Sequence, residues 1–190
     1  VMASHGRGRS AAVLGSVATE ILSVADQPVL LVGPNAIRSR FSTHGTAVVA
    51  VDGRNDDDVL SLMATLLGDT DFEPFVVNVV DPKEARELDL VRFGPGGSDL
   101  PAETSVAHRA AAHLEASTDV EAVDYEVEHN RKPADALVHQ AIEKRASLVV
   151  MTTHARQGFD RLASGSVAAD VVRDAPCLLY TSPSPRDLWI

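Results

Sequence analysis

The stretch from residue 151 to residue 166 carries the residue types best suited to bind an anion. It leaves an apolar run over 147–151 with Thr-Thr-His and ends at the small pair Gly165-Ser166, where a helix is expected to begin. The N-terminus of a helix offers free backbone N–H groups and the positive end of the helix dipole, which suit a phosphate group. The spacing therefore predicts a phosphate site, although a serine that only caps the helix fits the same residues.

Catalytic and metal chemistry have less support in the sequence. The seven histidines are scattered, and His108 and His113 are five positions apart, so they do not share one helical stripe. The acidic run at 56–58 could attract a metal ion, but a solvated helix start explains it better. The sequence contains no GxSxG, HExxH or CxxC motif. We therefore assign no catalytic residue and no metal ligand.

Composition and charge argue against several classes of partner. Lys and Arg number 17 against 27 for Asp and Glu, and the formal net charge is −10. A negative chain without a basic block is poorly suited to bind nucleic acid or anionic lipid. No apolar run approaches the roughly 20 residues of a membrane span, and the single cysteine, Cys177, fits a reducing compartment. We expect a cytoplasmic protein with no nucleic-acid and no membrane partner.

Strands and helices are expected to alternate along most of the chain. Apolar, β-rich runs predict strands over 46–52, 75–80, 120–128 and 147–151. Helices are predicted from caps at 55–58 to a stop at Gly68, over 102–117, from Pro133 with Leu137, Val138, Ala141 and Ile142 inward, and from 165–166 to about 174. This order, with a final strand expected after residues 174–177, predicts an α/β fold with an open, parallel, five-stranded sheet and helices on both faces. Ligands of such sheets bind beyond the carboxyl ends of the strands, which here carry Asp52, Asp81 and the turn after residue 151.

Two segments of the chain repeat each other at a domain-sized separation. Residues 15–18 (Gly-Ser-Val-Ala) recur as residues 165–168, and Ser-His at 4–5 corresponds to Thr-His at 153–154. A repeat of this length indicates two homologous domains, of which the first is present only as its C-terminal end. Chance similarity between two Gly-Ser helix starts is the alternative.

Several motifs, taken together and in order, resemble the universal stress protein family, which has an adenine nucleotide alpha hydrolase-like fold. The resemblance is carried by VVAVDG at 48–53, VVNV at 76–79, SLVVMTTH at 147–154, GSVA at 165–168 and DAPC at 174–177. It implies a tandem-domain protein. The expected divisions are the remnant of a first domain (1–34), a linker (35–43), a second domain (44–180) and a tail (181–190).

The resemblance also implies an ATP-binding signature of Gly, two residues, Gly, nine residues, Gly and then Ser or Thr. In the second copy the four places hold Thr152, Ala155, Gly165 and Ser166. Two of the three glycines are therefore replaced, and a Cβ at either place narrows the room for a triphosphate and disfavours a positive φ. In the remnant the corresponding places hold Ala3, Gly6, Gly15 and Ser16, with one residue fewer before the last glycine.

The resemblance implies nucleotide contacts from the strand ends as well. Asp52 matches a strand-end aspartate that contacts the adenosine part of the nucleotide. Val79 and Met151 match positions that line the base, and Val167 matches a backbone contact near the phosphates. The implied nucleotide-binding set is Ala50, Val51, Asp52, Val79, Met151, Thr152, Ala155, Gly165, Ser166 and Val167, with Gly6, Gly15 and Ser16 in the remnant. The implied ligand is ATP, which Mg²⁺ could accompany.

The last residues depart from the family pattern. The remnant ends in the apolar run 29–32, which suits a final strand, whereas the second copy reads LLYTSPSPRDLWI after Cys177. Prolines at 183 and 185 are expected to stop a sheet ladder. The stretch resembles translated sequencing-adapter read-through. We therefore expect residues after about 177, and the tail 181–190 in particular, not to be native.

The resemblance implies an adenine-nucleotide-binding regulatory protein of the stress response with a degenerate phosphate loop, and not an enzyme. A homologous domain, within the chain or in a homodimer, would be its partner through the last strand, and residues 29–32 could supply such an edge. Two alternatives stay open. One is a nucleotide-independent, dimerising interaction module, to which the replaced glycines point, and the other is a weak ATP hydrolase.

Overall fold

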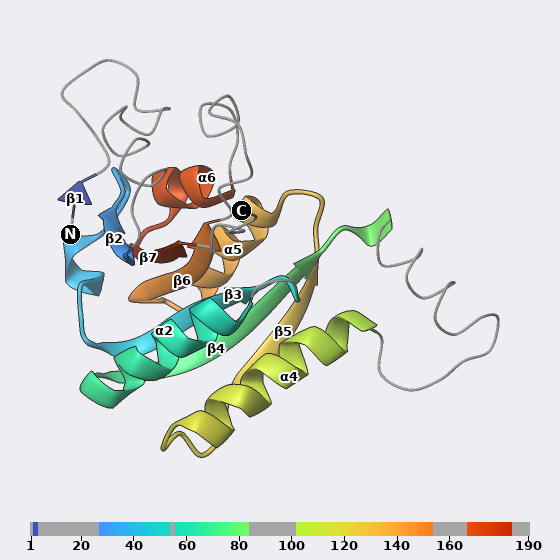
Figure 1. Cartoon of the computed structure of the whole chain (residues 1–190). Helices are drawn as coiled ribbons and strands as arrows, with labels where there is room; N and C mark the ends of the chain where they lie inside the picture. The colour runs from blue at the N-terminus through green and yellow to red at the C-terminus, as the bar shows by residue number, and fades with distance from the viewer. Residues whose placement is uncertain (1, 4–26, 54–55, 84–101, 154–166, 184–190) are drawn as a thin grey trace, which may run out of the picture.

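The chain forms one mixed sheet with helices packed on it (Figure 1). The computed structural model describes residues 2–3, 27–53, 56–83, 102–153 and 167–183. Its strands are β1 (Met2–Ala3), β2 (Val29–Val32), β3 (His44–Val51), β4 (Asp71–Val80), β5 (Asp124–His129), β6 (Leu148–Thr153) and β7 (Leu178–Pro183). Its helices are the short 3-10 helix η1 (Arg38–Arg40), α2 (Asp56–Asp69), α4 (Ala102–Ser117), α5 (Pro133–Glu143) and α6 (Val167–Asp174).

The order of the strands across the sheet is β1-β2-β7-β6-β3-β4-β5. The five strands from β3 to β7 are all parallel to their neighbours in this group, as the alternation of strands and helices predicts. The predicted α/β class and the open parallel sheet are therefore confirmed. The predicted number of five strands is too low, because the sheet also takes in β2 and the two-residue β1.

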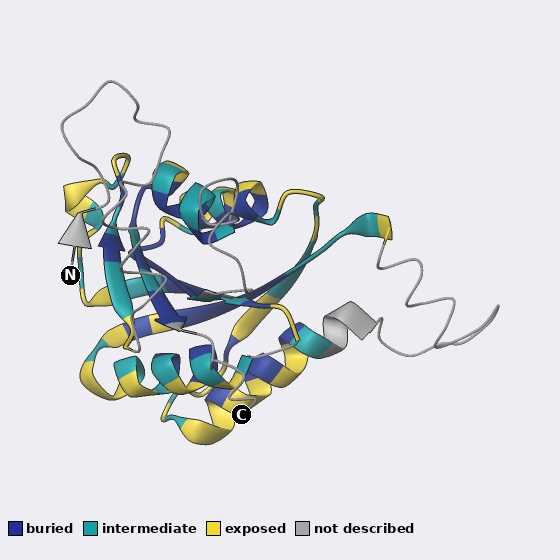
Figure 2. Ribbon diagram, turned by 45° about the horizontal axis from the view of Figure 1, so that its top comes forward, coloured by how far each residue is buried: buried dark blue, intermediate teal, exposed yellow. Residues whose placement is uncertain are grey.

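Helices cover both faces of the sheet, with the strands buried between them (Figures 1 and 2). Successive side chains of a strand point to opposite faces. Val48 and Val149 thus join a core layer under α5 and α6, while Val49 and Val150 join a second layer under α2 and α4. We call these the α5–α6 layer and the α2–α4 layer. Burial on both faces explains why the central strands are continuous apolar runs in the sequence.

Helix α2 does not stop at Gly68, where the sequence predicts its end. The helix passes through this glycine to Asp69, and Gly68 does not take a positive φ. The Oγ1 of Thr70 donates a hydrogen bond to the carbonyl oxygen of Leu66 at 2.7 Å. Strand β4 then begins at Asp71, so a hydroxyl group and an immediate strand start end this helix, and a left-handed glycine is not needed.

Two expectations about burial and strand bounds are wrong. Ile142, expected to point inward from α5, is 53% exposed, whereas Leu137 and Ala141 are buried. The next residue on a helix is turned by about 100°, which takes Ile142 beyond the buried stripe. The strand predicted over 120–128 begins only at residue 124, and β5 shows no clean alternation because it lies at the edge of the sheet.

Strand β7 lies inside the sheet, between β6 and β2. It runs parallel to β6 and antiparallel to β2, where Leu31 is opposite Leu179. The expected last strand of the remnant thus pairs with the last strand of the second copy. The apolar β2 has backbone groups that need partners, and β7 supplies them. Strand β7 extends to Pro183, and the non-native origin of residues 181–190 stays a prediction.

Candidate functional site

The carboxyl ends of β3 and β6 lie side by side where the strand order reverses. The chain runs from β3 to β4 to β5 and then returns to form β6 on the other side of β3. Val49 pairs with Val150, so the residues that follow, Ala50 and Met151, reach the same level at this edge. Such reversals are the usual ligand sites of open α/β sheets. The fold therefore brings together two of the strand ends that carry predicted site residues.

Four predicted site residues near this edge belong to one core layer or pack against it. Met151 is 7% exposed and belongs to the α5–α6 layer, and three half-buried residues pack against the same layer. We call this set the apolar floor, and it consists of Ala50, Val79, Met151 and Val167. Its members come from β3, β4, β6 and the first residue of α6. Partly open apolar side chains at a ligand edge suit the flat face of an aromatic ring.

Two other predicted residues do not belong to the floor. Val51 is 5% exposed and lies in the α2–α4 layer, so its backbone, and not its side chain, faces the edge. Thr152 is half-buried on β6 and lies opposite Ser182 of β7 in the strand register. Strand alternation explains both placements, because each residue directly follows a floor residue in the chain.

Asp52 is exposed in a tightly held turn between β3 and α2. The carboxylate of Asp56 accepts hydrogen bonds from the backbone N–H groups of Asp52 and Gly53, both at 2.9 Å. Gly53 has a φ of 78°, and a Cβ at this position would lie 3.0 Å from a methyl group of Val106 on α4. The left-handed conformation and the close approach both require glycine here. Asp52 is thereby fixed beside the apolar floor.

The carboxyl group of Asp56 has an unfavourable electrostatic environment. Its pKa is raised above the ordinary value of 3.8, chiefly because burial penalises the charged form. The two backbone hydrogen bonds lower the pKa, and the charges of Asp52 and Asp57 raise it further. The sequence suggested only a solvated helix start at 56–58. The missed signal is the spacing, since an aspartate a few residues after a strand-end Asp-Gly can close the turn with its side chain.

The remaining predicted site residues lie outside the described part of the chain. They are Ala155, Gly165 and Ser166, with Gly6, Gly15 and Ser16 of the remnant. The degenerate phosphate loop therefore stays a prediction. Among the residues that the structure describes, no three His, Cys, Asp or Glu side chains are grouped closely enough to hold a metal ion. No helix in the same part combines the length and the apolar character that a membrane crossing requires.

A parallel α/β sheet with an apolar floor and an aspartate at its strand reversal is an arrangement at which α/β domains usually bind their ligands. The family model of the universal stress proteins matches residues 44–180, most of the chain. The protein belongs to the universal stress protein family. The match begins at the first residue of β3 and ends within β7.

Individual relatives agree with this membership. Universal stress protein MJ0531 of Methanocaldococcus jannaschii is 37% identical over 54 residues, which are 28% of this chain and 32% of the relative. A universal stress protein structure from Archaeoglobus fulgidus superposes with a TM-score of 0.60 at 18% identity, covering 92% of this chain and 56% of the other. A universal stress protein in complex with cAMP superposes with a TM-score of 0.57 at 17% identity, covering 74% and 98%. The chain thus spans about half the length of the A. fulgidus structure.

Proposed function

We propose that this protein binds an adenine nucleotide at the joint edge of β3 and β6, and that ATP, with or without Mg²⁺, is its ligand. The observation that carries the proposal is the apolar floor beside Asp52. Four side chains from three strands and one helix lie in or against one core layer there, although they are far apart in the sequence. A relative with the same fold is known in complex with cAMP, which has the same base and sugar.

Each group at the edge has a distinct role in this proposal. The base lies on the half-buried side chains of Ala50 and Val79, beside the buried Met151. The exposed carboxylate of Asp52 accepts hydrogen bonds from the ribose hydroxyls. The phosphates extend toward Val167, at the beginning of α6, where the positive end of the helix dipole lies. Thr152 and Ala155 stand where the family signature has glycine, and we expect these replacements to lower the affinity without removing the base site.

The proposed action is regulatory and takes place in the cytoplasm. The hydroxyl group of Ser42 lies 2.6 Å from a ring nitrogen of His44. This pair lies at the beginning of β3, at the opposite end of the strand from the proposed nucleotide site, so hydrolysis is not part of the proposal. The antiparallel pairing of β2 with β7 supports a partner domain of the same family, joined through the last strands. The same pairing favours the second candidate function, a dimerising interaction module that needs no nucleotide.

Calorimetry tests the proposal directly. We expect the full chain to bind ATP, and Asp52→Ala to weaken binding about tenfold, because a hydrogen bond to a charged group is lost. The matched control is Asp69→Ala, which removes an exposed aspartate at the far end of α2. Absence of heat and of a thermal shift at millimolar ATP would contradict the proposal and favour the interaction module. Steady release of inorganic phosphate from ATP would instead support the weak hydrolase.

A further inference from the structure

Residues 33–41, which follow β2 on the way to β3, lie against the C-terminal ends of α5 and α6. We call these residues the clasp. Gly33 sits so close to α6 that a Cβ there would lie 1.8 Å from the carbonyl oxygen of Val172. Atoms do not approach that closely, so any side chain at this position must move the clasp away from the helix. The clasp is therefore in direct van der Waals contact with the helix backbone.

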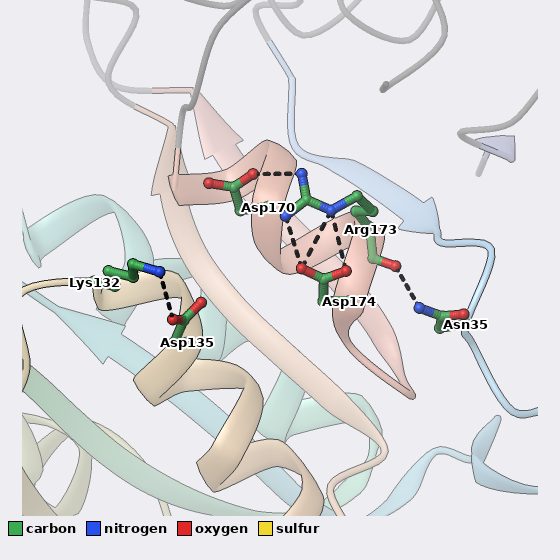
Figure 3. Close-up of polar contacts among 6 residues, drawn as sticks. All are labelled: Asn35, Lys132, Asp135, Asp170, Arg173 and Asp174. Carbon is green, nitrogen blue, oxygen red and sulfur yellow. Dashed lines mark hydrogen bonds and ion pairs between the residues drawn. The ribbon is translucent and has the colours of Figure 1, made fainter. Parts of the chain in front are cut away.

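Hydrogen bonds hold the rest of the clasp to the same region, and Figure 3 shows the one from Asn35. Each bond joins a donor in the clasp to a carbonyl oxygen at or just after a helix end. They run from Asn35 Nδ2 to Arg173 at 2.9 Å, from the N–H of Ile37 to Pro176 at 2.8 Å and from Arg40 Nη1 to Ala141 at 3.2 Å. Carbonyls in the last turn of a helix lack their usual donors within the helix. The clasp thus caps the last turn of α6 through Asn35, and it adds a second donor to the Ala141 carbonyl of α5, which also accepts the N–H of Ala146 at 2.9 Å.

The last turn of α6 offers the clasp a fixed surface. The guanidinium group of Arg173 pairs with Asp170 at 2.7 Å and with Asp174 at 2.8 Å, as Figure 3 shows. Val171 and Val172 of the same turn are buried in the α5–α6 layer. The helix has only eight residues, or about 12 Å of length, and it packs along one side on a dense core. A helix this short and this constrained moves as one unit.

The two ends of α6 contact two different parts of the molecule. Its first residue, Val167, belongs to the apolar floor, and its last turn holds the clasp. We propose that α6 couples the two, so that a nucleotide on the floor fixes the position of α6 and tightens the contact between the clasp and the last turn of α6. This coupling rests on the proposed function. A ligand that contacts α6 favours the helix position it binds best, and the clasp responds to that position.

The rate of tryptic cleavage of the full chain after Arg38 or Arg40 measures how readily the clasp opens. The short helix η1 must open locally before a protease can cut it. Mass spectrometry resolves these two cuts from all others. We expect Asn35→Ala to raise the cleavage rate about three- to tenfold, the equivalent of one hydrogen bond, and Gly33→Ala to raise it more. The control is Asp135→Ala, which removes an exposed ion pair with Lys132 on the first turn of α5 and should change nothing. Equal cleavage rates in Asn35→Ala and the wild type would contradict the role of the Asn35 hydrogen bond in holding the clasp to α6.

The same cleavage assay with saturating ATP then tests the coupling. A shift in the unfolding temperature of the protein, measured in parallel, shows whether ATP is bound. We expect ATP to slow cleavage after Arg38 at least threefold in the wild type and to have a smaller effect in Asn35→Ala. A thermal shift without a change in cleavage would overturn the coupling and leave the proposed function intact. No thermal shift at all would overturn the proposed function, and the coupling with it. A peptide substrate in the same tube shows that ATP does not act on trypsin.

Discussion

The two faces of the sheet are built from the same strands, but only one of them carries the candidate site. The α2–α4 layer contains fully buried aliphatic side chains, such as Val49, Val150 and Leu114, and holds no floor residue. The α5–α6 layer is equally well packed, but it also supports the apolar floor and the clasp. Adjacent residues of one strand therefore have different roles. Substitutions at neighbouring positions, such as 150 and 151, should therefore separate effects on stability from effects on the proposed nucleotide binding.

The largest effect on stability is expected from Leu114→Ala in the α2–α4 layer. The side chain is fully buried on α4, and its removal leaves a cavity that costs about 2–5 kcal/mol of unfolding free energy. Urea denaturation measures this loss. Calorimetry on the variant, under conditions where it is folded, should give the wild-type affinity for ATP. A weakened affinity would show that the two faces are not independent.

Met151→Ala should lower stability and nucleotide affinity together, since Met151 is part of the α5–α6 layer and of the apolar floor. We expect a loss of about 2 kcal/mol in unfolding free energy and about tenfold in affinity, from lost apolar contact with the base. The neighbouring control, Val150→Ala, lies on the other face and should cost stability alone. Equal affinities in the two variants would argue against a base on the floor.

Gly53→Ala tests the turn that fixes Asp52. A positive φ and the contact with Val106 predict a loss of about 1–2 kcal/mol in unfolding free energy. Gly68→Ala is a matched control, because Gly68 lies in α2 with open space around it, and alanine favours a helix. That variant should be more stable than the wild type by about 0.5–1 kcal/mol. Thermal unfolding of both proteins distinguishes the two glycines by the sign of the change.

The smallest effect is expected from the titration of Asp56. Its raised pKa means that the folded state binds the proton more tightly than the unfolded state does. Its contribution to stability is therefore fully present below the ordinary pKa of 3.8 and is lost as the pH rises through the raised value. Asp56→Asn removes this titration. Urea denaturation at several pH values should show a flatter decline for the variant in that window, and identical slopes would contradict the assignment.

Much of the fold could be predicted from the sequence, because continuous apolar runs and helix caps are local signals. The helix over 102–117 and the start of α5 at Pro133 agree with the structure. The end of α2 was predicted incorrectly because Gly68 suggested a glycine stop. In the structure the helix continues to Asp69, and the hydroxyl group of Thr70 caps its last turn. Of the candidate site, the strand ends were predictable from position alone. The hydrogen bonds from the turn to Asp56 and the close contact of Gly33 with α6 could not be predicted. Both depend on distances in the folded structure, which the spacing of residues along the chain does not give.

The central position of β3 has a consequence for the order of folding. Strand β3 is the first strand of the family match, yet its neighbour β6 is about a hundred residues further along the chain, since Val49 pairs with Val150. Non-local pairings of this kind slow folding, because a long loop must close before the contact is gained. During synthesis, β3 and β4 can pair early, but the other edge of β3 stays open until β6 has left the ribosome. That open edge is the part of the nascent chain most in need of protection from aggregation.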